Sequence, residues 1–173
     1  YLLAKFESDY YEALKHNLSL NPVLHSFQNT VKEYNIPDQY IQAFLQSMKY
    51  DYSKTEYNNK SEIDEYIYGS ADVVGLMCLK VFCDGDEERF RDLEFPAKKL
   101  GSAFQKVNFL RDLKNDMEVL NRKYFPEIDK SSFNEEIKSK VIKDIASDFE
   151  IAYKGIKKLP GKPKLAVTIA YFY

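Results

Sequence analysis

The chain has 173 residues, of which 45% are hydrophobic and 30% are charged, and its formal net charge is −2. This balance is typical of one folded domain with a sizeable core and excludes a disordered chain. The slightly negative charge argues against a nucleic-acid partner. No apolar run reaches the length expected of a membrane span, and no secretory signal is present, so a cytoplasmic protein is expected. The chain begins at Tyr1 rather than Met, which indicates a piece of a longer protein.

Apolar residues at spacings of three and four predict helices along nearly the whole chain. Asn21 is the expected N-cap of the second helix, with Pro22 at its first position. Ser61 and Asp64 form a pair resembling a capping box, which predicts another helix start. No alternating pattern predicts a strand, so the fold class is all-α, a single helical bundle. The expected helices begin at residues 2, 22, 37, 61, 95, 132 and 163.

The helix predicted over residues 95–120 carries a polar stripe on an otherwise apolar circumference. At about 100° per residue, the stripe falls within an arc of about 80°. Apolar residues occupy most of the remaining circle, which indicates a central helix. Charge buried on such a helix must pair, bind metal or line a wet cavity, because leaving it unpaired is costly. The stripe consists of Gly101, Gln105, Asn108, Asp112 and Asp116.

The stripe predicts half of a metal-bridged diphosphate site. Asp112 and Asp116 are four residues apart, so their charges repel by a few tenths of a kcal/mol, roughly. A divalent cation removes this penalty, and Mg²⁺ prefers oxygen ligands shared between carboxylates and substrate phosphates. Asn108 can add an amide oxygen, while Gln105 and Arg111 can hydrogen-bond to phosphate oxygens.

Two patterns leave a structural alternative open. The acidic stripe can also be a solvated face in which the carboxylates pair with Lys98 or Lys114. In the preceding helix, Gly69 and Gly75 each cost about 1 kcal/mol against alanine. Their benefit is either close helix packing or room for a long ligand beside Tyr66.

Cys78 and Cys83 are five residues apart, without a metal-binding spacing. They are therefore expected to be core residues of a protein from a reducing compartment.

The segments GSADVVGLM and KLGSAFQKVNFLRDLKNDMEVLNRKYFP resemble the squalene/phytoene synthase family, and look most like its bacterial phytoene synthase branch. The family pattern is a small-residue helix ending in Val-Gly, then Gly-x-x-x-Gln-x-x-Asn-x-x-Arg-Asp-x-x-x-Asp, then Arg-x-Tyr-x-Pro. The resemblance covers essentially the whole chain. It implies that residues 1–173 are a partial domain of the isoprenoid synthase type, lacking its N-terminal helices. The residues that fit in fixed register are Gly101, Gln105, Asn108, Arg111, Asp112, Asp116, Arg122, Tyr124 and Pro126.

The resemblance implies a prenyltransferase that condenses two prenyl diphosphates head to head by Mg²⁺-assisted ionisation of one diphosphate. In the phytoene synthase branch, the substrates are two geranylgeranyl diphosphates and the product opens carotenoid biosynthesis. One alternative is a squalene-type synthase that uses farnesyl diphosphate. The other is a non-catalytic prenyl-binding homologue.

The resemblance also implies roles for individual residues. Asp112, Asp116 and Arg111 are the expected catalytic residues. Asn108, Asp112 and Asp116 are the expected ligands of Mg²⁺, for which Mn²⁺ can substitute. The expected substrate-binding residues are Gln105, Arg111, Tyr66, Ala71, Val74, Gly75, Gly101, Arg122 and Tyr124.

The sequence departs from the family pattern in three ways. It contains no second Asp-x-x-x-Asp motif, so the 173-residue chain alone is expected to be inactive. Asn115 stands where an acid is usual. Glu56 and Asp72 stand where Arg and Gly are common.

Lipid substrates imply peripheral contact with the inner face of a membrane. No feature of the sequence predicts a particular oligomeric state.

Overall fold

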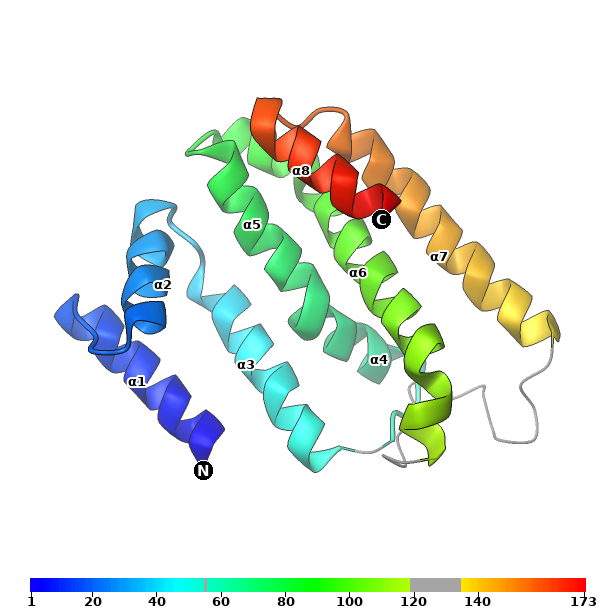
Figure 1. Cartoon of the computed structure of the whole chain (residues 1–173), viewed down its shortest axis with the longest axis horizontal. Coiled ribbons are helices and arrows are strands. Elements are labelled where there is room, and N and C mark those ends of the chain that lie inside the picture. The colour runs from blue at the N-terminus through cyan, green and yellow to red at the C-terminus, as the bar shows by residue number, and fades with distance from the viewer. Residues whose placement is uncertain (55, 119–134) are drawn as a thin grey trace.

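The computed structural model describes residues 1–54, 56–118 and 135–173, with only the backbone of residues 114–118 and 137. Within these ranges every element is helical and no β-strand is present (Figure 1). The all-α prediction is therefore confirmed. The elements are α1 (Leu2–His16), α2 (Pro22–Glu33), α3 (Asp38–Ser53), α4 (Lys60–Ile67), the π-helical turn η1 (Tyr68–Asp72), α5 (Val73–Cys83), α6 (Glu87–Glu118), α7 (Glu135–Ile156) and α8 (Gly161–Phe172).

Four helices, α3, α5, α6 and α7, pack in sequence as neighbours and run side by side in Figure 1. Helices α1 and α2 pack together at the α3 end of this row, and α8 lies across α6 next to α7. One core joins α1, α2, α3, α5 and α6. Its buried members include Tyr10, Leu24, Leu45, Leu76 and Phe90, from α1, α2, α3, α5 and α6.

The ends of two helices test the capping predictions. Asn21 caps α2, because its side-chain oxygen accepts two backbone N–H groups of the first turn, at 3.0 and 3.4 Å. The Ser61–Asp64 prediction was wrong. Asn59 caps α4 instead and accepts the backbone N–H of Glu62 at 3.0 Å, so the helix begins one residue earlier than expected.

Helix α6 begins at Glu87 and not near residue 95, where the sequence prediction placed its start. Proline is disfavoured inside helices, but α6 runs through Pro96. Asp86 caps the helix by accepting the backbone N–H of Arg89 at 2.9 Å. The Pro96 ring lies against Gly155 of α7, where an added Cβ would be only 2.3 Å from the proline Cβ. The absence of a side chain at Gly155 therefore makes room for the proline ring between α6 and α7.

The segment α4–η1–α5 is one of the two central helices of the bundle, beside α6. Its run from Lys60 to Cys83 includes an 18-residue window with a mean hydropathy of 1.4, long and apolar enough to cross a membrane. The prediction that no run has this length was therefore wrong. The fold gives the physical reason for the composition: the segment packs against α3 on one side and α6 on the other.

Backbone contacts at two glycines bring this central helix close to its neighbours. A Cβ on Gly69 would lie 2.4 Å from the carbonyl oxygen of Ala43 on α3. A Cβ on Gly101 would lie 2.8 Å from the carbonyl oxygen of Ala71 in η1. Close helix packing therefore explains Gly69, and the same device joins η1 to α6.

Buried charges fix α7 against α6. Asp148 of α7 is 2% exposed and accepts hydrogen bonds from Lys99 and Lys106 of α6, each at 2.7 Å. Burial alone would lower the pKa of Lys106, but its hydrogen bonds to Asp144 and Asp148 outweigh this effect and raise the pKa. A buried ion pair of this kind is costly to break from one side, so it holds the two helices in one register.

Candidate functional site

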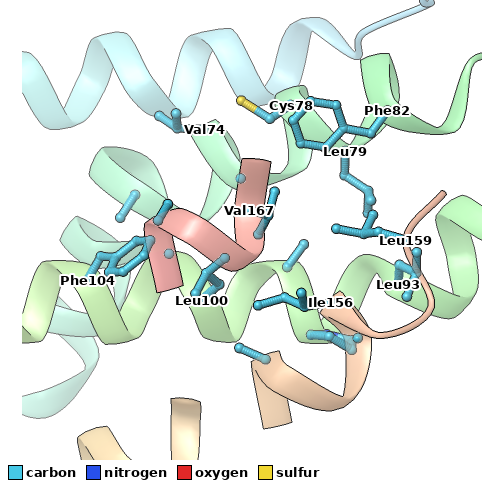
Figure 2. A pocket seen from close by; sticks show the side chains of 18 of the residues that line it. Val74, Cys78, Leu79, Phe82, Leu93, Leu100, Phe104, Ile156, Leu159 and Val167 are labelled. Carbon is cyan, nitrogen blue, oxygen red and sulfur yellow. The ribbon is translucent and has the colours of Figure 1, made fainter. Parts of the chain in front are cut away.

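A cavity of about 430 Å³ lies between η1, α5, α6, α7 and α8. Its wall combines residues far apart in the sequence, as Figure 2 shows. The volume falls within the range of small-molecule sites, about 300–1,000 Å³. The labelled wall residues are Val74, Cys78, Leu79 and Phe82 from α5, Leu93, Leu100 and Phe104 from α6, Ile156 from α7, Val167 from α8, and Leu159 between the last two helices.

The cavity wall is almost entirely apolar. Among its residues only Ser70, Cys78 and Gln105 carry a polar side-chain group. The Ser70 hydroxyl is buried and has no hydrogen-bond partner among the described residues. A wall of this composition suits a long hydrocarbon and excludes ordered water, because water needs several polar partners.

Five of the expected substrate-binding residues lie in this wall: Ala71, Val74, Gly75, Gly101 and Gln105. Gly75 faces the cavity at a point where an added Cβ would be 3.0 Å from the carbonyl oxygen of Ala97. The missing side chain of Gly75 therefore serves both close helix packing and the space inside the cavity.

Tyr66 lies outside the cavity, although the sequence analysis expected it there. Its ring stacks on Phe109 at 6.1 Å in a second buried cluster, and its hydroxyl donates to Asp51 at 2.8 Å. The π-helical turn is the physical reason. An extra residue per turn rotates the face of the helix that follows η1 relative to the face that precedes it.

Several wall residues were not anticipated from the sequence. The half of the wall from α7 and α8 includes Ala152, Gly155 and Val167. The small residues of these helices repeat at helical spacing, but this pattern alone does not distinguish a cavity wall from an ordinary helix contact. Cys78 was expected in the core but is exposed toward the cavity, whereas Cys83 is buried as expected.

The polar stripe of α6 begins where the cavity wall ends. Gln105 belongs to the wall, and its side-chain oxygen accepts a hydrogen bond from the Asn108 amide nitrogen at 3.4 Å. One turn further, the Arg111 guanidinium donates two hydrogen bonds to the Asp112 carboxylate, at 2.9 and 2.8 Å. Asp116 follows on the same helix, but its side chain lies outside the described residues.

The paired guanidinium keeps the Asp112 carboxylate ionised. The hydrogen bond from Arg111 is the main reason that the pKa of Asp112 is lowered from its usual value. The Asp112 side chain is 43% exposed, so it remains accessible to a ligand or a metal ion. Lys98, one of the two expected lysine partners, pairs instead with Glu94 at 3.0 Å. The other, Lys114, has a side chain outside the described residues.

The donor chemistry of the stripe fits a hard cation. Asp112 offers an ionised, accessible carboxylate, and Asn108 turns its amide nitrogen toward Gln105, which leaves its oxygen for another partner. Oxygen ligands of this kind suit Mg²⁺ or Mn²⁺. Within the described ranges, no three His, Cys, Asp or Glu side chains are grouped closely enough to hold a metal ion. The predictions for Arg122 and Tyr124 concern residues outside these ranges.

A buried acid lies directly behind the cavity wall. Asp72, in η1, is 9% exposed and accepts a hydrogen bond from the Ser102 hydroxyl at 2.8 Å. Burial raises the pKa of Asp72 from 3.8 to about 6. The pair lies beside the contact between Ala71 and Gly101, so it reinforces the closest approach of η1 to α6.

Comparison with known proteins identifies the family. The family model for squalene/phytoene synthase matches residues 1–135. Phytoene synthase 1 (chloroplastic) from Zea mays is 32% identical over 93 residues, a stretch that covers 53% of this chain and 23% of the maize protein. The crystal structure of squalene synthase HpnC from Alicyclobacillus acidocaldarius superposes with a TM-score of 0.77 at 21% identity. That match covers 98% of this chain and 67% of the other.

The structural match establishes a shared fold. The family match covers the part of the chain that forms α1 to α6. The chain spans about a quarter of the maize relative and about two thirds of the bacterial structure. Because the family model matches well over half of its residues, this chain belongs to the squalene/phytoene synthase family.

Proposed function

We propose that this chain is part of an enzyme that condenses two prenyl diphosphates head to head. The observation that carries the proposal is the continuity of two opposite chemistries on α6. An apolar cavity of about 430 Å³ ends at Gln105, and the stripe with Asn108 and Asp112 begins there. A prenyl diphosphate has the same two parts, a long hydrocarbon and a highly charged head.

The polar stripe supplies the groups needed at the diphosphate end. Arg111 uses Nε and one terminal nitrogen on Asp112, so its other N–H donors are available to phosphate oxygens. Gln105 can donate from the cavity edge. Asn108, Asp112 and Asp116 would hold Mg²⁺, which supplies positive charge to stabilise the departing diphosphate.

The cavity wall supplies what the hydrocarbon end requires. Ionisation of an allylic diphosphate leaves a carbocation, which water would quench. Apolar residues from α5, α6, α7 and α8 line the space and offer water few hydrogen-bond partners beside the cation. Gly75 and Gly101 let α5 and η1 approach α6 closely, which joins the parts of the wall that these elements form.

We propose geranylgeranyl diphosphate as the substrate and phytoene as the product, in carotenoid biosynthesis. The similarity to a phytoene synthase from Zea mays supports this choice over farnesyl diphosphate. Because substrate and product are lipids, the enzyme is expected to work in the cytoplasm at the inner face of the membrane.

Product analysis tests this proposal with the enzyme expressed from its full gene. With Mg²⁺ present, geranylgeranyl diphosphate should give phytoene, and farnesyl diphosphate should turn over at least about 10-fold more slowly. Val74→Phe should slow the reaction because it fills the cavity, whereas Val23→Phe, at a site 69% exposed on α2, should not. Faster turnover of farnesyl diphosphate would indicate a squalene-type synthase. No turnover of either would support the non-catalytic alternative.

A further inference from the structure

The outer side of α8 is an exposed apolar stripe. Leu165, Ile169 and Phe172 are 65%, 62% and 71% exposed, and their spacing of four and three places them on one face. The opposite face of α8 contributes Ala166 and Val167 to the cavity. One helix therefore separates the cavity from an apolar surface that no other described residue covers.

Positive charge gathers at the end of the stripe where α8 begins. Glu150 is the last acid of the sequence, and the segment 151–173 contains five lysines. All five lysines are exposed, and none forms an ion pair with a described residue. The rest of the chain is acidic overall, because the total net charge is only −2. The lysine cluster consists of Lys154, Lys157, Lys158, Lys162 and Lys164.

We propose that the α8 stripe (Leu165, Ile169 and Phe172) and the lysine cluster together form a docking surface for an anionic lipid bilayer. Charge complementarity selects this occupant. Lysines attract anionic headgroups, while leucine, isoleucine and phenylalanine side chains gain by entering the acyl boundary. A nucleic acid would use the lysines but not the aliphatic stripe. An acidic protein is the remaining competitor and is distinguished by the experiment below.

Docking on this face would place the cavity next to the source of its ligands. Val167 lines the cavity, and Ile169 faces outward about half a turn further along the same helix. A prenyl chain could pass from the bilayer around α8 with little exposure to water. This step rests on the proposed function, because it assumes a lipid substrate. The docking itself does not require the enzyme to be active.

Residues 1–173 contain no tryptophan, so Phe172→Trp adds a fluorescent reporter to the stripe, and any tryptophan elsewhere in the full polypeptide is replaced by Phe. The protein is mixed with vesicles of phosphatidylcholine, with and without phosphatidylglycerol. We expect Trp emission to shift to the blue only with the anionic vesicles, and brominated lipids to quench it. Raising the salt concentration should reverse the shift, because electrostatic attraction to the surface is screened.

Matched variants separate the two contributions. Replacing Lys157, Lys158, Lys162 and Lys164 together by Gln should weaken vesicle binding at least about 10-fold. Replacing Lys138, Lys140 and Lys143 of α7 by Gln removes exposed lysines elsewhere and should have a much smaller effect.

For the apolar part, Leu165→Ser with Ile169→Ser should abolish binding. Leu20→Ser with Val23→Ser, at the exposed start of α2, should not.

Three outcomes would overturn the proposal. They are an unchanged Trp spectrum with anionic vesicles, binding that the α8 variants do not alter, and a Trp already blue-shifted without lipid in the protein expressed from the full gene. The third would mean that protein, either another part of the polypeptide or a partner, covers α8. Activity measured with detergent-dispersed substrate provides a separate check. An inactive enzyme that still docks would count against the proposed function alone.

Discussion

Replacing Asp112 by Ala in the enzyme expressed from its full gene should lower turnover by a factor on the order of 10³ or more. Asp112 is the described carboxylate of the polar stripe, and Arg111 holds it ionised. Its loss would remove the proposed metal ligand and leave Arg111 without the partner that orients it. Steady-state turnover with Mg²⁺ measures the effect, and far-UV circular dichroism checks that the helices remain.

Two variants make this result specific. Asp92→Ala removes an exposed acid from the same helix, about five turns earlier, and should leave turnover unchanged. Asp112→Asn keeps the shape of the side chain but not its charge, so it should be nearly as slow as Asp112→Ala and should require more Mg²⁺. Near-normal turnover of Asp112→Ala would refute the assigned role of this carboxylate.

Replacing Asp72 by Asn should remove a pH dependence from the stability of the protein. The folded pKa of Asp72, about 6, is above its ordinary value of 3.8, mainly because of burial. Ser102, Lys98 and Lys99 favour the ionised form and Asp148 opposes it, but burial outweighs their sum. A raised folded pKa stabilises the protein at low pH, and this contribution is lost as the pH rises through about 6.

Urea unfolding between pH 4 and pH 7 measures this contribution. The free energy of unfolding of the wild type, relative to Asp72→Asn, should fall by about 2 kcal/mol over this interval. Asn can still accept the hydrogen bond from Ser102, so the comparison isolates the charge. Asp92→Asn, at an exposed site on α6, serves as the control. A difference that is constant with pH, or that grows as the pH rises, would contradict the assignment.

The sequence predicted the class of fold and the central place of α6 because both depend on periodicity. Apolar residues on most of the α6 circumference required packing on several sides, and α6 does contact α5, η1 and α7. The start of α6 was missed because a proline inside a helix is normally unfavourable. The ring of Pro96 has room because Gly155, the residue that faces it on α7, has no side chain. Gly155 is far from Pro96 in the sequence.

The candidate site could be predicted in part. The positions of Ala71, Val74, Gly75 and Gly101 follow from the regular spacing of a helix and from the resemblance. Tyr66 could not be placed correctly, because the π-helical turn between it and Ala71 changes the angular relation of the two residues. No rule of local sequence reports such a turn.

The side of the cavity formed by α7 and α8 depends on tertiary contacts alone. Asp148 meets Lys99 and Lys106 across the helix pair, and these buried charges bring Ala152 and Gly155 to the cavity. In the sequence, the same residues look like an ordinary amphipathic helix with scattered small side chains. Their role becomes visible only when the partner helix is in place.

The central claim is that the cavity and the polar stripe of α6 form one site for one ligand. Calorimetric binding of an unreactive thio analogue of geranylgeranyl diphosphate to the enzyme from the full gene tests it most directly. We predict saturable binding that requires Mg²⁺ and that weakens at least about 10-fold both in Asp112→Asn and in Val74→Phe. Binding that is equally tight in EDTA and in both variants would contradict the account.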